Sequence, residues 1–230
     1  LTLNTITGLF GAGGSITYGT LETVNVDLGS GGDTFTIAST HAGTTTLDTL
    51  GGVDTVHVQS VAGPTTVSTG AAGDTINVQT IDAVLTVNAG DDDDTINVGS
   101  NAPAGNGNVN GIAAGLTVNG DGGSGDTMNV DDTADNLANT GNLTSTQLTG
   151  LGMSVGITYG TLETVNVDLG SGGDTFTIAS THGGITTLDT LGGADTVNVR
   201  TIAGPTTVNT GDAADTVNVG SLAPATGGTT

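Results

Sequence analysis

A five-residue pattern recurs through this chain at nearly constant spacing. It reads Asp-Thr, an apolar residue, then Asn, Thr or His, then Val or Ile, and its eight copies begin at Asp33, Asp54, Asp74, Asp94, Asp126, Asp174, Asp195 and Asp215. Five of the seven intervals between copies are 20 or 21 residues. Such a period is typical of a solenoid, in which each coil buries its apolar side only against the next coil.

Each period contains two segments with the alternation of a half-buried strand. One is the repeated pattern itself, the Asp-Thr strand, as in residues 74–78 (DTINV). The other, the companion strand, lies about half a period upstream of the next pattern, as in residues 85–88 (LTVN). Alternation with period two places the apolar residues of both segments on one face. We therefore predict an all-β protein, a parallel β-solenoid (a β-roll or β-helix) with coils of about 20 residues and two strands each.

A longer repeat is superimposed on the short one. Residues 16–41 recur without change at 157–182, and similarity at this offset defines a long internal repeat of 16–80 and 157–221. Between the copies, an insertion at 99–115 and irregular coils at 131–156 break the rhythm. We expect residues 1–230 to form one continuous solenoid segment, and we expect that segment to belong to a longer repetitive protein.

The charge balance limits the possible partners. The chain has one Arg and no Lys against 23 acidic residues, a net charge of −22, which excludes nucleic acid as a main partner. It has no apolar run of the roughly 18 residues that a membrane-spanning helix needs, so we expect no membrane insertion. A chain without Cys and almost without basic residues suits an extracellular or cell-surface location.

The acidic residues concentrate in one turn of each coil. Stacked coils would place the strand-opening carboxylates about 4.8 Å apart, where neighbouring charges repel by roughly 3 kcal/mol at an effective dielectric near 20. Calcium would offset this repulsion, because Ca²⁺ accepts about six to eight oxygen ligands in irregular geometry. The alternative is that Asp only begins the strand and accepts a nearby backbone hydrogen bond. The candidate calcium ligands are Asp33, Asp54, Asp74, Asp92, Asp94, Asp126, Asp174, Asp195 and Asp215.

Two turns resemble a known calcium-binding repeat. Residues 69–77 (TGAAGDTIN) and 89–97 (AGDDDDTIN) keep the second Gly, the sixth-position Asp and the apolar eighth residue of the haemolysin-type (RTX) nonapeptide GGxGxDxUx. The resemblance implies a parallel β-roll with Ca²⁺ held between turns by Asp and backbone carbonyls. The whole chain is also similar to the long repeat regions of giant bacterial secreted and surface proteins.

These observations predict an extracellular structural segment: a spacer, fibre or adhesin stalk. Neither end reads as a polar cap, so we expect end-to-end self-association or further coils in a longer parent chain.

Two alternatives stay open. Ranks of Thr and Asn on the outward strand faces resemble ice-binding surfaces, and the repeated Glu22 and Glu163 are compatible with a polysaccharide-associated module or enzyme. We expect no enzyme activity, because His41, His57 and His182 have no nucleophile or metal partner at a recognisable spacing.

Overall fold

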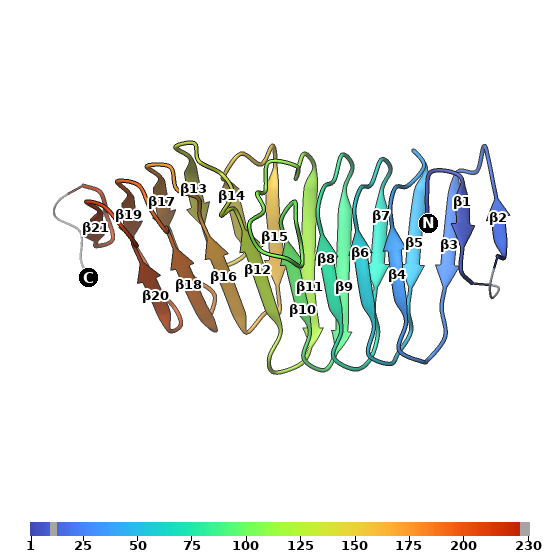
Figure 1. The fold of residues 1–230 in the computed structure, drawn as a ribbon. Helices are drawn as coiled ribbons and strands as arrows, with labels where there is room; N and C mark the ends of the chain where they lie inside the picture. The colour runs from blue at the N-terminus through green and yellow to red at the C-terminus, as the bar shows by residue number, and fades with distance from the viewer. Residues whose placement is uncertain (10–12, 226–230) are drawn as a thin grey trace.

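The protein is two long β-sheets facing each other across a thin apolar layer (Figure 1). The computed structural model describes residues 1–9 and 13–225, and the regular structure in these residues is entirely β. The chain passes from one sheet to the other and back in each regular coil, and the coils stack from the N-terminal end to the C-terminal end. The predicted all-β solenoid with two mostly parallel sheets is therefore confirmed.

The eight-stranded sheet is parallel throughout. In spatial order it contains β4 (Thr34–Ile37), β6 (Thr55–Val58), β8 (Thr75–Val78), β10 (Thr95–Val98), β12 (Thr127–Asp131), β16 (Thr164–Asp168), β18 (Ile185–Asp189) and β20 (Thr206–Asn209).

The eleven-stranded sheet is parallel except at its centre, where β14 runs against both of its neighbours. In spatial order it contains β3 (Thr23–Asp27), β5 (Thr44–Asp48), β7 (Thr65–Ser68), β9 (Leu85–Asp91), β11 (Gly115–Gly122), β15 (Gly156–Gly160), β14 (Gln147–Gly150), β13 (Thr140–Leu143), β17 (Thr175–Ile178), β19 (Thr196–Val199) and β21 (Thr216–Val219). A separate antiparallel hairpin joins β1 (Thr5–Thr7) to β2 (Ser15–Thr17).

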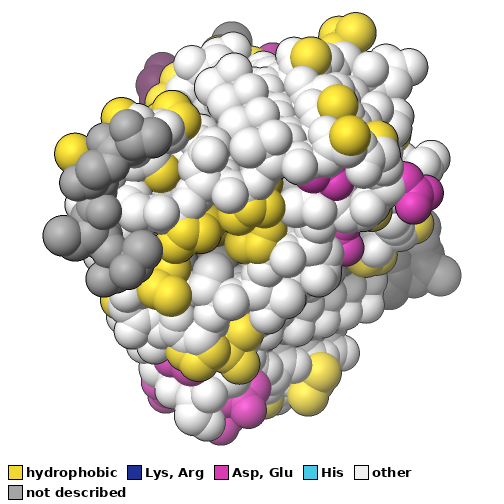
Figure 2. Space-filling view, turned by 90° about the vertical axis from the view of Figure 1, so that its left-hand side faces the viewer, with side chains coloured by type: hydrophobic (Ala, Val, Ile, Leu, Met, Phe, Trp, Pro, Cys, Tyr) yellow, Lys and Arg dark blue, Asp and Glu magenta, His cyan; other side chains and the backbone are white. Residues whose placement is uncertain are grey.

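The core consists of in-register columns of apolar side chains. Ile76 pairs with Ile96, and Val78 pairs with Val98, so that equal positions of successive coils lie over one another. These four side chains are at most 1% exposed. The last described coil differs: Val217 and Val219 were also expected inside, but they are 47% and 64% exposed, because β21 is the edge strand of its sheet. Figure 2, which views this end, shows apolar side chains at the surface.

The Asp-Thr strands do not stay in one sheet. Up to residue 131 they form the eight-stranded sheet (β4, β6, β8, β10 and β12), and the companion strands lie opposite. From β16 onward the companion strands continue the eight-stranded sheet, and the Asp-Thr strands β17, β19 and β21 lie in the other. The uniform stacking of all eight Asp-Thr strands expected from the period is therefore wrong. Thr127 of an Asp-Thr strand pairs instead with Thr164 of a companion strand.

The exchange occurs at the irregular coils. The chain places β13, β14 and β15 consecutively in the eleven-stranded sheet, whereas β12 pairs directly with β16 in the other. One sheet thus gains two extra strands, β13 and β14, that have no counterpart across the core. The extra strands act as a wedge, and in Figure 1 the strands on the C-terminal side are inclined relative to those on the N-terminal side.

The long repeat extends further upstream in the structure than the sequence similarity indicated. Tyr18 donates its hydroxyl to the carbonyl of Thr2 at 2.8 Å, and Tyr159 donates in the same way to Thr144 at 2.5 Å. Tyr18 directly follows β2 and Tyr159 lies in β15, and each of these strands pairs antiparallel with the strand before it. Residues 1–9 are therefore the structural counterpart of residues 143–151.

The core assignment predicts different costs for one substitution at two sites. Ile76→Ala should destabilise the protein by about 2–5 kcal/mol, because Ile76 is fully buried between two coils. The same change at Ile185, which is 50% exposed on a strand of the same sheet, should cost less than about 1 kcal/mol. Denaturant unfolding of both variants measures the difference, and equal costs would contradict the assignment.

Candidate functional site

The strand-opening aspartates connect successive coils through their carboxylates. The backbone N–H of Asp54 donates to Oδ1 of Asp74 at 2.7 Å, and the N–H of Asp74 donates to Oδ1 of Asp94 at 2.7 Å. In the reverse direction, the N–H of Thr95 donates to the carbonyl oxygen of Asp74 at 2.9 Å. Each Asp therefore bonds to the next coil through its backbone N–H and carbonyl, and to the preceding coil through its carboxylate. The N–H group that donates to each carboxylate belongs to the preceding coil. The turn alternative had assumed a donor two residues further along the same coil.

The exchange of strands divides these residues into two carboxylate ladders. The first ladder runs Asp33, Asp54, Asp74, Asp94 and Asp126, and the second runs Asp174, Asp195 and Asp215, with donor–acceptor distances of 2.7 to 3.0 Å. The sequence period suggested one continuous line, and that expectation is wrong, because β12 is followed by β16 rather than by another Asp-Thr strand.

Glu163 and Asn139 complete the ladders where they break. The N–H of Asp126 donates to Oε2 of Glu163 at 2.9 Å, so a Glu occupies the place of the next Asp. The second ladder begins with the N–H of Asn139, which donates to Oδ1 of Asp174 at 2.7 Å. Neither role was expected from the sequence. A signal existed for Glu163, because LETVNV repeats the Asp-Thr pattern with Glu in place of Asp.

The ladder carboxylates are buried, and their second oxygens are mostly without a partner. Asp54, Asp74, Asp94 and Asp126 are at most 2% exposed, and the buried Oδ2 of each accepts no hydrogen bond. Asp195 is the exception, because Thr190 donates its hydroxyl to Oδ2 at 2.6 Å. Four successive buried oxygens in the first ladder thus call for a proton or a cation, since an unpaired buried charge is costly.

Burial changes the titration of these groups. It is the largest influence on Asp94, whose pKa is raised to about 7. The hydrogen bond from the Asp74 N–H lowers this pKa by a smaller amount, and the negative charges of Asp74, Asp126 and Asp92 raise it further. Burial is also the largest cause of the raised pKa values of Asp74, Asp126 and Asp174. The neutral acids are therefore favoured well above the pH at which a free Asp ionises.

The remaining candidate ligands lie at the rims of the ladders. Asp92 is exposed, at φ +75° in the turn before Asp94, and Asp33 and Asp215 are half-buried in the first and last Asp-Thr coils. Gly90, the second Gly of the RTX-like motif, lets the turns stack: a Cβ there would lie 1.9 Å from the carbonyl oxygen of Gly70. Within the described residues no three His, Cys, Asp or Glu side chains are grouped as a metal site. The first ladder instead presents one buried, unpartnered carboxylate oxygen at each of four successive coils.

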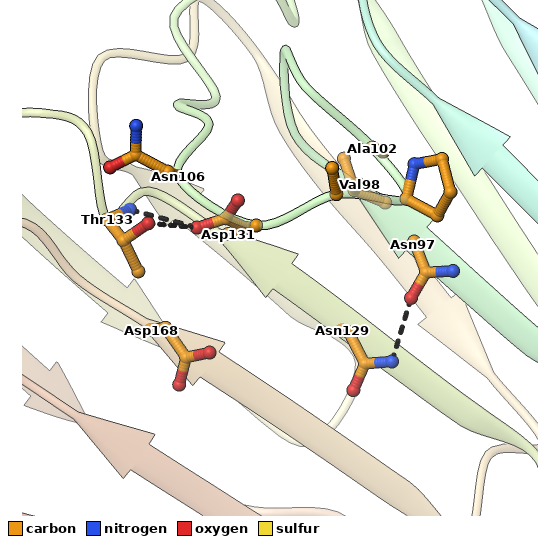
Figure 3. A pocket seen from close by; sticks show the side chains of 11 residues that line it. Asn97, Val98, Ala102, Asn106, Asn129, Asp131, Thr133 and Asp168 are labelled. Carbon is orange, nitrogen blue, oxygen red and sulfur yellow. Dashed lines mark hydrogen bonds between the residues drawn. The ribbon is translucent and has the colours of Figure 1, made fainter.

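A second acidic region lies beside the insertion. A cavity of about 320 Å³ opens between the loop at 102–106 and the ends of β12 and β16 (Figure 3). Asp131 holds the loop, because its carboxylate accepts the N–H of Gly107 at 2.7 Å and the hydroxyl of Thr133 at 2.6 Å. The pKa of Asp168 is raised by burial first and then by Asp189 and Asp131. The ionisable residues that line the cavity are Asp131 and Asp168, whose negative charges disfavour phosphate or another anion.

Asp132 is a buried acid that the sequence analysis missed. It is 1% exposed, its Oδ1 accepts the N–H of Val109 at 3.0 Å, and its Oδ2 has no partner. Burial raises its pKa to about 7, and the charges of Asp135, Asp174 and Asp131 add to the increase. Asp132 anchors the insertion to the coil that begins the sheet exchange.

Two of the histidines are held in equivalent places. His41 accepts or donates at Nδ1 with the Thr45 hydroxyl at 3.4 Å and meets the Tyr18 ring edge-on at 6.0 Å. His182 repeats both contacts with Thr186 and Tyr159. The Nε2 atoms of His41 and His182 are buried without a hydrogen-bond partner.

Comparison with known proteins gives no relative: no protein-family model, no curated protein and no solved structure matches the chain. Among the described residues, no helix is long and apolar enough to cross a membrane. The class that the fold defines is therefore a repetitive, two-faced parallel β-solenoid, and the function is argued from its geometry alone.

The raised pKa values predict that acidification stabilises the metal-free protein. A carboxyl whose pKa is higher in the folded state favours folding at low pH, and this contribution is lost as the pH rises through the folded pKa. The thermal midpoint in chelator should therefore rise as the pH falls from 8 to 5. Asp94→Asn keeps an acceptor oxygen and removes the charge, so it should stabilise the protein at pH 8, on the order of 2 kcal/mol, and flatten the profile.

Asp92→Asn is the matched control, because Asp92 is an exposed acid two residues away. It should leave the pH profile nearly unchanged. A profile that is flat between pH 5 and 8 in the parent protein, or an equal response of the two variants, would show that the buried carboxyls do not carry this effect.

Proposed function

We propose that this protein is a rigid structural segment, a spacer, fibre or adhesin stalk, that acts outside the cell. The observation that carries the proposal is the continuity of both sheets from the first coil to the last, including the coils where the strand types exchange. Hydrogen bonds from each coil to its neighbour resist bending and slippage, and a negative, almost Lys- and Arg-free surface suits exposure to solvent.

The alternatives have less support in the geometry. Outward Asn side chains hydrogen-bond to one another, as Asn97 to Asn77 and Asn129 to Asn97, both at 2.9 Å. Their amides therefore stabilise the stack and are not free to bind ice, and the neighbouring Thr column is interrupted by Ile185.

For a polysaccharide enzyme the candidate acid is Glu163. Its Oε2 already accepts the Asp126 N–H, so this carboxylate has a structural role in the ladder.

Calcium is a second candidate function of the first ladder. The observation that favours it is the row of unpartnered, buried Oδ2 atoms at Asp54, Asp74, Asp94 and Asp126. Neighbouring carboxylates and turn carbonyls are the hard oxygen donors that Ca²⁺ prefers. A bound cation would neutralise the carboxylates in place of the proton. The likeness of residues 69–77 and 89–97 to RTX repeats is part of this proposal.

Rigidity can be tested with a pair of spin labels, because the chain has no Cys. Labels on Cys at Val53 and Ile202, which are 68% and 54% exposed, lie toward opposite ends of the solenoid. A rigid segment should give one narrow distance distribution. Its width should match that of a short control pair at Ile185 and Ile202, where label motion alone sets the width. A much broader distribution for the long pair would contradict the proposed function.

The calcium candidate predicts a specific change in stability. Millimolar Ca²⁺ should raise the thermal midpoint at pH 8 relative to chelator, because binding to the folded state alone stabilises it. The same concentration of Mg²⁺ should have less effect, since Mg²⁺ demands near-octahedral geometry. Asp94→Asn should reduce the calcium response, and Asp92→Asn should reduce it less. A midpoint unchanged by calcium would remove calcium from the account and leave protonation as the source of neutrality.

A further inference from the structure

The N-terminal end carries a surface whose identical copy is buried elsewhere in the same molecule. Residues 16–41 and 157–182 have the same sequence, so any difference between them arises from their surroundings. Ile16 is 45% exposed and Ile157 is 1% exposed, and Leu21 is 46% exposed whereas Leu162 is 6% exposed. The same side chains thus act as core in one copy and as surface in the other.

The second copy is covered by three elements of the preceding coil. Strand β15 pairs with β11, and β16 pairs with β12. The loop at 132–139 lies over the turn that follows β16, where the N–H of Ser171 donates to the carbonyl oxygen of Asp135 at 2.9 Å. In the first copy, β3 is the edge strand of its sheet. No described residue donates a hydrogen bond to the carboxylates of Glu22 or Asp33, whose counterparts Glu163 and Asp174 end and begin the two ladders.

Two glycines in each copy show the same difference between a covered and an uncovered backbone. A Cβ at Gly170 would lie 1.7 Å from the carbonyl oxygen of Asp135, and a Cβ at Gly172 would lie 2.0 Å from that of Leu137. These positions must be Gly because the loop's backbone lies directly on them. A Cβ at their counterparts, Gly29 and Gly31, would meet nothing within 4 Å. Since Gly loses more conformational freedom on folding than other residues, it is unfavourable at positions that have no need of it.

The uncovered surface also has a hollow where the loop would lie. A cavity of about 550 Å³ is bounded by the β1–β2 hairpin and by β3 with its following turn, including Leu28 and Asp33. Leu28 is half-buried there, whereas its counterpart Leu169 is fully buried.

We propose that this N-terminal face, formed by Ile16, Leu21, Glu22, Gly29, Gly31 and Asp33, is a docking surface for another coil of the same repeat. The matching coil has the sequence and shape of residues 115–139, that is, β11, β12 and the loop that follows. It would pair with the edge strand β3, donate a strand-opening Asp N–H to Glu22, and lay its loop on Gly29 and Gly31. This inference rests on the proposed structural function. It identifies the surface on which one solenoid segment would pack against another.

A tandem protein tests the docking surface. A copy of residues 1–142 placed directly before Leu1 joins Asn142 to Leu1, as Asn142 is joined to Leu143 in the chain itself. The native chain has no Cys, so a single Leu21→Cys in the second unit reports coverage by its rate of labelling with a thiol reagent. Labelling in the tandem protein should be at least about tenfold slower than in the 230-residue protein, since covered sites react only after opening.

Three controls make the test decisive. Leu162→Cys in the 230-residue protein should label as slowly as the tandem Leu21→Cys, and Val53→Cys, at a position 68% exposed, should label equally fast in both proteins. Adding Gly29→Ala and Gly31→Ala to the second unit should restore fast labelling in the tandem protein. In the 230-residue protein these substitutions should not lower the thermal midpoint, whereas Gly170→Ala and Gly172→Ala should lower it.

Fast labelling of Leu21→Cys in the tandem protein would overturn the docking proposal, as would slow labelling that the two alanines fail to relieve. Neither result depends on the rigidity of the single segment. The spin-label distances report that property separately, so a narrow distribution together with fast labelling would reject the docking surface alone.

Discussion

The stack of coils depends on a hydrogen bond from the backbone N–H of one strand-opening residue to the carboxylate of the next coil. In the first ladder the N–H of Asp33 reaches Asp54 and that of Asp94 reaches Asp126. Buried backbone N–H groups need a hydrogen-bond partner within the protein. For the buried Asp54 and Asp74 that partner is the carboxylate of the next coil. Asp satisfies this need and also places a charge in a buried position. Burial of this charge raises the pKa of Asp94, and a bound proton or cation would neutralise the carboxylate.

The sheet exchange shows how the ladder accommodates irregularity. When β16 follows β12, the next position carries Glu163, and its longer side chain still accepts the Asp126 N–H. The inserted pair β13 and β14 separates β15 from β17 in one sheet only, and the second ladder begins from Asn139 on the other side of this wedge. The irregular coils thus change the inclination of the strands, and the same N–H to carboxylate contact links the coils on each side of them.

The sequence contained the period, the two strands of each coil and most of the core, because alternation and a fixed coil length leave few other ways to bury columns such as Ile76 and Ile96. It could not reveal the exchange of sheets. The strands β12 (TMNVD) and β16 (TVNVD) have the same pattern, so either fits the other's place with equal burial. The strand-opening Asp residues were recognisable as a set, but their hydrogen-bond donors were not, because those donors come from neighbouring coils.

Residue-resolved amide hydrogen exchange tests the coil-to-coil hydrogen bond most directly. The N–H groups of Asp54, Asp74 and Asp94 lie in turns, where exposed amides such as that of Asp92 exchange quickly. If the ladder holds the coils together, these three amides should exchange as slowly as those of the buried core strands, such as Val78. Exchange of the three Asp amides at the rate of Asp92 would show that the carboxylates do not bridge the coils and would contradict the account.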